Sequence, residues 1–429
     1  MKRFYRHLLA LAALLLVCPL QGRAEDDTLV ELEQYIRYGL GESAALRSAF
    51  ESYSAVSFQV PQASALPDPM LTYGYFLRSV ETRVGPQRQK MGIAQSFPWF
   101  GTLPLKAEIV GAEANAEFNR FLALKNNLVF EIVKAYTELA YVDATIAITN
   151  ETIGLVKSWE GILQERFRTG TGTHNDLIRV QVELGKLEDK LFELNDVRTP
   201  LSATLNALLN RDDTLVVTLQ PDFLEISSRE SVAEISVETM LSNNPELRML
   251  DAVQEAKAKG VQLAEKKFYP DVTVGLDYIE VGDRDVADGG DDAIMGMVSL
   301  NLPINLAKNR AAVGEAKAKE RSVREMRKDK EHRLRAELSR AHYSVRESKR
   351  KMALYRNTLI PKTQESIEAS YTAYQAGDSG FLDVIDSEER LLEFQLTLKR
   401  AQADHIIAVT TLRKLAGSYN ELRTASEKE

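Results

Sequence analysis

Residues 118–167 carry the pattern that most constrains this chain, because side chains recur there in unbroken alternating steps of three and four residues. The positions are Phe118, Phe121, Lys125, Leu128, Ile132, Ala135, Leu139, Val142, Ile146, Thr149, Ile153, Val156, Glu160, Leu163 and Phe167. Only Lys125, Thr149 and Glu160 are not apolar. Such steps average 3.5 residues per turn, which keeps one seam facing a partner helix in a left-handed supercoil. The pattern therefore predicts a long helix that lies along a partner helix.

A second series of the same kind follows the turn Arg168-Thr-Gly-Thr-Gly-Thr-His-Asn-Asp176. Its positions are Leu177, Val180, Leu184, Leu187, Leu191, Leu194, Arg198, Leu201, Leu205 and Leu208. The two arms predict an antiparallel coiled-coil hairpin with helices over about 105–168 and 176–209. At about 1.5 Å per residue the first arm is on the order of 90 Å long, which exceeds any compact domain. Charged residues occur throughout this arm, and because charged side chains are costly within a bilayer, the arm cannot lie in lipid.

The first 24 residues have the composition of a secretory signal peptide. Three basic residues precede an apolar stretch over residues 8–17, and a small-x-small cleavage site ends at Ala24. We expect cleavage after Ala24. Acylation of Cys18 in a lipoprotein is the alternative, and it is disfavoured by the neighbouring Val17 and Pro19.

Composition narrows the classes of function. Removal of residues 1–24 takes away four basic residues and no acid, which moves the net charge from −8 to −12. Because an acidic chain binds nucleic acid poorly, no nucleic acid is expected as a partner. The cleaved chain would contain no cysteine, which excludes disulfides and thiol chemistry. Beyond the signal no apolar run approaches the roughly 18 residues of a membrane-spanning helix, so strands would have to make any membrane crossing.

The chain repeats itself at an offset of about 200 residues, which indicates two copies of one unit. Leu40-Gly-Glu-Ser-Ala-Ala-Leu-Arg47 aligns with Leu241-Ser-Asn-Asn-Pro-Glu-Leu-Arg248. We expect a first repeat over 25–228 and a second over 229–429. Each unit reads as a short helix, two strands and two long helices. The long helices of the second repeat are predicted over about 313–376 and 382–416, with a bend at Pro361 and a weaker one at Pro200 in the first repeat.

Alternation with a period of two residues predicts four strands. Their ranges are about 70–78, 91–97, 271–280 and 294–302, with loops over 79–90 and 281–293 between them. Strands of roughly nine residues suit a tilted span of a membrane. Four strands cannot close a barrel, and unpaired backbone groups facing lipid cost several kcal/mol each. If these strands enter a membrane, other chains must therefore complete the barrel.

In these features the chain resembles the TolC family of bacterial outer-membrane efflux proteins, over essentially its whole mature length. The resemblance rests on the repeat, on the strand-to-helix junctions, and on the two turn motifs. The junctions are Gln95-Ser-Phe-Pro-Trp-Phe-Gly101 and Asn301-Leu-Pro-Ile-Asn305. The turn motifs are Arg166-Phe-Arg-Thr-Gly170 and Tyr374-Gln-Ala-Gly377. The resemblance implies a mainly α fold with a membrane β-barrel. Long coiled-coil helices would form an α-barrel tunnel, and a homotrimer would share a twelve-stranded barrel in outer-membrane lipid.

The resemblance also implies a function. Such proteins are passive exit ducts of tripartite efflux pumps, coupled through a periplasmic adaptor (a membrane fusion protein) to an inner-membrane transporter. We expect a transporter of the resistance-nodulation-division type. The stretches Leu66-Pro-Asp-Pro-Met70 and Phe97-Pro-Trp-Phe-Gly101 are similar to the branch that exports heavy-metal cations. Drugs or other small molecules are the other substrates to be expected.

Gly170 and Gly377 each end a long predicted helix. Glycine is common there because it adopts the left-handed backbone of a C-terminal cap without strain. The resemblance adds that a missing side chain lets the tip of an adaptor hairpin approach closely. Phe167, in the first turn motif, is assigned to the same docking tip.

Acidic residues follow both turns. Asp176, Asp383 and Asp386 fall in the first turn of a returning helix, where a carboxylate interacts favourably with the helix dipole. Asp383 and Asp386 are three residues apart and share one helical face. The resemblance implies that this pair narrows the periplasmic mouth as two stacked acidic rings, with Tyr374 and Asp176 in the same gate. A packing role for Tyr374 is the open alternative.

No cofactor, metal site or enzymatic activity is expected. The acidic loop Asp283–Asp292 lacks the spacing of a calcium loop, and the histidines show no metal-ligand or nucleophile constellation. The alternative function is a periplasmic coiled-coil scaffold or adaptor without a membrane barrel. Such a scaffold has no need of aromatic, lipid-facing strands of membrane length, and these separate the two hypotheses.

Overall fold

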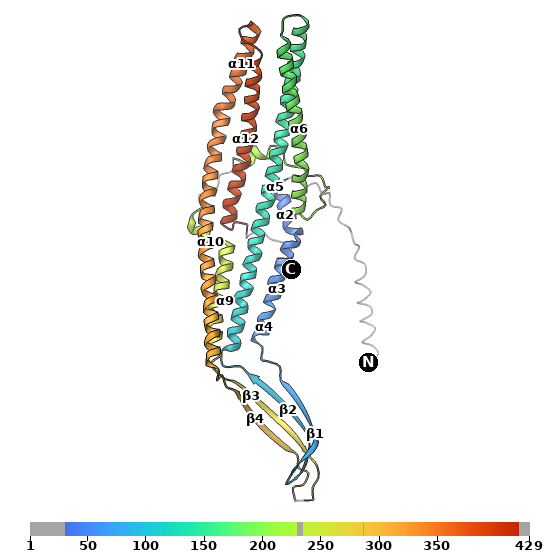
Figure 1. The fold of residues 1–429 in the computed structure, drawn as a ribbon, viewed down its shortest axis with the longest axis vertical. Helices are drawn as coiled ribbons and strands as arrows, with labels where there is room; N and C mark the ends of the chain where they lie inside the picture. Colours follow the sequence, from blue (N-terminus) through green and yellow to red (C-terminus); the bar gives the residue numbers. More distant parts are fainter. Residues whose placement is uncertain (1–30, 230–234, 286, 420–429) are drawn as a thin grey trace, which may run out of the picture.

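Long helices form a column, and a curved sheet extends from one end of it (Figure 1). The computed structural model describes residues 31–229, 235–285 and 287–419, so the predicted signal peptide and Cys18 lie outside the described residues. Within those ranges, no helix is both long enough and apolar enough to cross a membrane.

The first hairpin pairs α5 (Thr102–Arg168) with α6 (His174–Leu208). The 67 residues of α5 span about 100 Å, somewhat more than expected because the helix begins three residues earlier. Since α6 has 35 residues, it accompanies only the half of α5 that is distant from the sheet. The other half packs on the shorter helices, which are α2 (Leu32–Glu42), α3 (Ala44–Ser57), α4 (Gln59–Ser64) and α9 (Pro245–Lys266).

The second hairpin pairs a composite helix with α12 (Leu382–Leu415). The composite helix consists of α10 (Leu306–Leu354), the π-helix η1 (Tyr355–Leu359) and α11 (Ile360–Ala376). Proline at 361 has no N–H to donate and its ring crowds the preceding turn, which explains a local widening at this point. The expected irregularity at Pro361 is therefore a five-residue π-helix within a continuous column. Two further short helices are α7 (Phe223–Ser227) and α8 (Val237–Asn243).

The apolar seam of α5 is buried, and so are two of its three polar positions. Lys125 and Thr149 have no exposed surface, and Ile132 and Leu139 beside them in the series are equally buried. The hydroxyl of Thr149 donates to the carbonyl of Thr145 at 2.8 Å, which satisfies it within the helix. The Lys125 ammonium lies 5.7 Å from the centre of the Phe121 ring. The alternating pattern therefore identified the buried face of α5, including Lys125 and Thr149, whereas Glu160 is half-buried and Phe167 at the end of the series is exposed.

The sheet is antiparallel, with the order β1-β2-β3-β4. Its strands are β1 (Met70–Thr82), β2 (Gly85–Phe97), β3 (Asp271–Val281) and β4 (Ala293–Asn301). The predicted loop over 79–90 was wrong, because β1 and β2 continue to a tight turn at Arg83 and Val84. Polar residues occupy both faces at this end, so the two-residue alternation fades there although the backbone pairing persists.

The strand register divides the sheet into an apolar and a polar face. Leu71 pairs with Ile93, Ile93 with Leu276, and Leu276 with Gly296, so these positions share one face. The exposed apolar side chains of this face are Leu71, Tyr73, Tyr75, Met91, Ile93, Phe97, Val274, Leu276, Tyr278, Ile294, Val298 and Leu300. The opposite face carries the ion pair between Lys90 and Asp277 (2.7 Å) and the contact between the Ser96 and Thr273 hydroxyls (2.8 Å).

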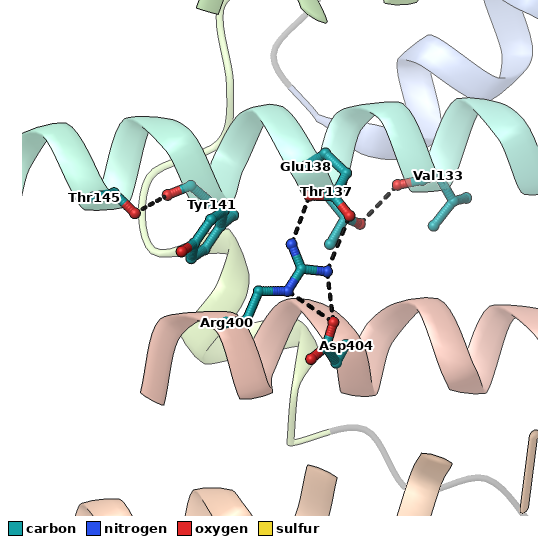
Figure 2. Close-up of polar contacts among 7 residues, drawn as sticks. All are labelled: Val133, Thr137, Glu138, Tyr141, Thr145, Arg400 and Asp404. Atoms are coloured by element: carbon teal, nitrogen blue, oxygen red, sulfur yellow. Dashed lines mark hydrogen bonds and ion pairs between the residues drawn. The ribbon is translucent and has the colours of Figure 1, made fainter. Parts of the chain in front are cut away.

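A charged cluster joins α5 to α12 where the two hairpins lie side by side (Figure 2). The Arg400 guanidinium donates to both carboxylate oxygens of Glu138, at 2.7 and 3.0 Å, and to Asp404 at 2.8 Å. The guanidinium also lies 5.0 Å from the centre of the Tyr141 ring. Bidentate pairing of this kind fixes geometry as well as adding energy. Arg400 therefore fixes the position of the second hairpin against the first, on the sheet side of the turns.

Candidate functional site

The candidate site is the pair of helix turns at the end of the column that is distant from the sheet (Figure 1). In the first turn Gly170 has a left-handed backbone (φ 74°), and the N–H groups of Thr171 and Gly172 donate to the carbonyl of Arg166 at 2.8 and 2.9 Å. The hydroxyl of Thr173 accepts from the N–H of Asp176 at 3.2 Å and so caps α6. Local hydrogen bonds thus hold the first turn.

The second turn uses a glycine in the same way. Gly377 has φ 80°, and the N–H of Asp378 donates to the carbonyl of Ala373 at 2.9 Å. A Cβ atom added at Gly170 or Gly377 would meet no atom within 4 Å, so the left-handed backbone alone requires glycine there. Both turns present open space outward, which is compatible with close approach of a partner. Their docking role remains a prediction.

Phe167 and Tyr374 occupy equivalent places in the two turn motifs but lie in opposite environments. Tyr374 is buried, and its ring packs edge-on against Phe381 with centroids 5.1 Å apart. The Arg166 guanidinium, from the other hairpin, lies 4.4 Å from the centre of the Tyr374 ring. Burial raises the pKa of the Tyr374 phenol. Phe167 is 46% exposed, and its ring lies 5.2 Å from that of His174.

The three acidic residues also differ. Asp176 is half-buried, and its carboxylate accepts from the Thr173 hydroxyl at 2.7 Å, so it belongs to the cap of α6. Asp383 and Asp386 are exposed, and neither carboxylate forms an ion pair or hydrogen bond within the described part of the chain. Two free carboxylates on one face of α12 suit the predicted acidic rings, whereas Asp176 suits a structural role. Their role in a gate remains a prediction.

The sequence reasoning missed a group between the two hairpins. Trp159 of α5 packs on Phe381 (5.5 Å) and on Tyr371 (4.8 Å). The rings of Trp159 and Phe381 border a cavity of about 20 Å³, room for one water molecule, that Glu183 and Glu388 also line. Phe381 is 1% exposed and therefore anchors the second turn. The sequence did contain a signal for this aromatic group, since Trp159 is adjacent to Glu160, which is a position of the alternating series.

Burial and neighbouring groups shift the pKa values of the carboxylates at this cavity. Burial raises the pKa of Glu388, which is 9% exposed and forms no ion pair within the part of the chain that is described. Burial and the neighbouring Glu389 raise the pKa of Glu183, whereas the hydrogen bond from Glu183 lowers the pKa of Glu389. Lys186 donates to Glu183 at 2.8 Å and to Glu389 at 3.4 Å. Lys186 thus links α6 to α12 beside this cavity.

The acidic loop between β3 and β4 is held by protein groups. Asp288 pairs with Arg83 at 3.1 Å, and Asp292 accepts from the N–H of Val281 at 2.9 Å. Across residues 31–229, 235–285 and 287–419, no group of three or more His, Cys, Asp or Glu side chains is placed to hold a metal ion.

Sequence comparison connects the chain to known proteins. The family model described as outer membrane efflux protein matches residues 237–418. Nodulation protein T of Rhizobium leguminosarum bv. trifolii is 22% identical over 431 residues, which cover 92% of this chain and 87% of that protein. Outer membrane protein TolC of Vibrio cholerae is 20% identical, over 71% of this chain and 70% of that protein.

Structural comparison gives the same result for the fold. The crystal structure of CusC matches with a TM-score of 0.77 at 16% identity, and the match covers 90% of this chain and 91% of that one. The likeness includes the mainly helical architecture and the four antiparallel strands. The matched family model and the shared fold agree: residues 237–418 match the outer membrane efflux protein family, and the chain has the fold of the TolC-family channels.

Proposed function

We propose that this chain is the outer-membrane exit duct of a tripartite efflux pump and that three copies form the working channel. One observation carries the proposal: the four-stranded sheet exposes a continuous apolar face, and β1 and β4 pair with no further strand in the described chain. Exposure of such an apolar face to water is unfavourable, and so is exposure of unpaired strand edges to lipid. A barrel shared between copies in the outer membrane resolves both difficulties.

The number of strands supports a trimer. Transmembrane barrels have about eight strands or more, so two copies are the minimum and three copies give twelve strands. The polar face, with Lys90 and Asp277, then lines the duct, and the apolar face contacts lipid. The column of helices extends from the barrel into the periplasm as the tunnel.

We assign the helix turns to the contact with a periplasmic adaptor, which couples the duct to an inner-membrane transporter of the resistance-nodulation-division type. Gly170, Gly377 and Phe167 form the docking surface. Asp383 and Asp386 narrow the mouth, while Tyr374 and Asp176 hold the turns that carry them. Acidic rings in a closed trimer attract cations and repel one another, which favours opening when an adaptor supplies contacts to the open state.

The cargo is proposed as small molecules that the transporter delivers. Heavy-metal cations are the specific expectation from the junction around Phe97-Pro-Trp-Phe-Gly101, and drugs are the alternative. Because a passive duct exerts little selection, the transporter sets the substrate range.

The test compares two neighbouring positions on β4 that lie on opposite faces. Val298 is 71% exposed on the apolar face, and Ser299 is exposed on the polar face. Arginine in the lipid-facing half of a barrel costs about 2–4 kcal/mol, whereas arginine in the lumen costs little. Val298→Arg should therefore abolish heat-resistant trimers in outer-membrane fractions, and Ser299→Arg should leave trimers that conduct ions in planar bilayers.

The scaffold hypothesis predicts a different outcome. If the strands form a soluble sandwich, the wild-type chain is recovered from the periplasm without membranes, and neither substitution alters a bilayer conductance. Recovery of soluble, non-conducting wild-type protein would therefore overturn the duct.

A further inference from the structure

A second site lies where the sheet meets the helices, at the opposite end of the column from the turns. A cavity of about 680 Å³ opens there between the starts of α5 and α10 and the end of α9. Its sheet residues are Ser96, Asp271 and Asn301, all on the polar face by the strand register. The cavity therefore opens on the side that lines the duct in the proposed barrel.

Four lysines line this cavity: Lys106 on α5, Lys266 and Lys267 at the end of α9, and Lys308 on α10. None of the four ammonium groups forms an ion pair or hydrogen bond within residues 31–229, 235–285 and 287–419. Most other lysines of the long helices are paired, as in Lys190 with Glu193 (2.7 Å) and Lys351 with Glu347 (2.9 Å), although Lys349 and Lys399 form no ion pair within the described ranges. The concentration of unpaired cations at one cavity is thus a local feature.

The cavity has little negative charge of its own. Asp271 is the one carboxylate among its lining residues, and one of its oxygens already accepts from the N–H of Trp99 at 3.0 Å. Two long helices also begin at the cavity, since Thr102 and Asn305 line it. Their N-terminal dipole ends add to the positive potential of the lysines. Apolar side chains of Leu263, Leu302 and Ile304 complete the lining.

We propose that this lysine pocket, formed by Lys106, Lys266, Lys267 and Lys308, binds organic anions as they pass through the duct. The lysines receive the carboxylate or phosphate groups, and the apolar lining contacts the carbon skeleton. The inference rests on the proposed function, because the duct brings cargo to the polar face. It also narrows the cargo: three such pockets in a trimer favour anionic molecules at this level, which supports the small-molecule alternative over free heavy-metal cations.

A tryptophan beside the pocket can report binding through its fluorescence. Trp99 stacks on Tyr269, with ring centroids 4.9 Å apart and an interplanar angle of 11°, and Tyr269 lines the pocket. The Lys266 ammonium lies 6.0 Å from the centre of the Tyr269 ring. The chain has two tryptophans, Trp99 and Trp159, so a Trp159→Phe background leaves Trp99 as the single indole fluorophore.

The experiment titrates the detergent-purified full chain in the Trp159→Phe background with citrate and with pyrophosphate, at ionic strength held constant with chloride. We expect a saturable change of Trp99 fluorescence with both probes. Lys267→Gln/Lys308→Gln should weaken the apparent affinity about tenfold, because two of four attractive charges are lost. Lys190→Gln/Lys351→Gln removes the same charge outside the pocket and should leave the titration unchanged.

Three results would overturn the pocket: no saturation with either probe, equal weakening in the two double variants, or a response to phosphatidylglycerol nanodiscs without a response to soluble anions. The last result would assign the lysines to lipid headgroups. Conductance of the same preparation in planar bilayers tests the duct separately. A conducting trimer that fails to bind the anions refutes the pocket and retains the function, whereas a non-conducting protein refutes the function.

Discussion

The two helix turns each contain a glycine with a left-handed backbone, yet they are stabilised differently. The first is held by its own hydroxyls: Thr169 donates to the carbonyl of Glu165 at 3.0 Å, Thr171 donates to that of Arg166 at 3.2 Å, and Thr173 caps α6. The second has no side-chain cap at Phe381 and is anchored instead by buried aromatic rings. The first turn is therefore self-supporting, while the second depends on the neighbouring hairpin.

This difference suggests a division of labour. A turn that is stabilised locally keeps its shape when its surroundings move, so the first turn suits a fixed outer surface. A turn that is stabilised by contacts across to α5 changes its environment when the hairpins separate. The free carboxylates of Asp383 and Asp386 lie on this second, dependent hairpin. The moving part of the mouth is accordingly expected on α11 and α12.

The largest expected effect comes from the equivalent aromatic pair. Tyr374→Ala removes a buried ring and should cost about 3 kcal/mol locally, or a roughly hundredfold faster amide exchange over residues 374–390. Phe167→Ala removes a half-exposed ring and should cost under about 1 kcal/mol. Hydrogen exchange with mass spectrometry measures both. Equal effects at the two positions would remove the distinction between the turns.

Glycine substitutions should have intermediate and matched effects. Gly170 and Gly377 share a left-handed backbone and open surroundings, so Gly170→Ala and Gly377→Ala should each cost about 1–2 kcal/mol of local stability with the trimer intact. Tryptophan at either position should in addition reduce export by the assembled pump, because it obstructs the adaptor. Export at the wild-type level in both tryptophan variants, with normal trimers, would refute the docking role.

The smallest expected effect concerns pH. The pKa values of Glu183 and Glu388 are raised above the ordinary 4.5, so their contribution to hairpin contact is complete below pH 4.5 and is lost as pH rises through the raised values. Glu389 has a lowered pKa, so its contribution is lost only as pH falls below that range. The contact between the hairpins should therefore tighten on acidification.

Glu388→Gln fixes the neutral form and tests this sign. Amides of α12 near the cavity should exchange a few-fold more slowly than in the wild type at pH 7.5, with the difference vanishing toward pH 4.5. Glu393→Gln, an exposed change on the same helix, is the matched control and should have no such effect. Faster exchange in Glu388→Gln at pH 7.5 would reverse the assignment.

Periodicity predicted the long helices and the strands well, because a helix or strand with one apolar face has apolar residues at regular intervals in its sequence. The seam at Ile132 and Leu139 and the apolar face at Leu71 and Leu276 are examples. Those elements recur in both halves, which made the pattern legible twice. The end of the first strand hairpin near Arg83 and Val84 was missed, because both of its faces are polar and the two-residue alternation is absent there.

Interactions between distant segments were beyond that reasoning. The contact of Arg166 with Tyr374, the cavity at Glu388 and the lysine pocket each join residues that are far apart in the chain. Their positions depend on how the hairpins and the sheet are packed, which no local period records. The turn glycines were accessible because a left-handed cap is a local requirement.

The most direct test of this account is single-channel conductance of the purified trimer in planar bilayers, compared among wild type, Asp383→Ala/Asp386→Ala and Asp176→Ala. The account predicts small, cation-selective wild-type currents, a large increase with loss of selectivity in the double variant, and near wild-type currents in Asp176→Ala. Equal opening by the double variant and Asp176→Ala would contradict the assignment of the mouth to the second hairpin. Absence of conductance from all three proteins would contradict the duct itself.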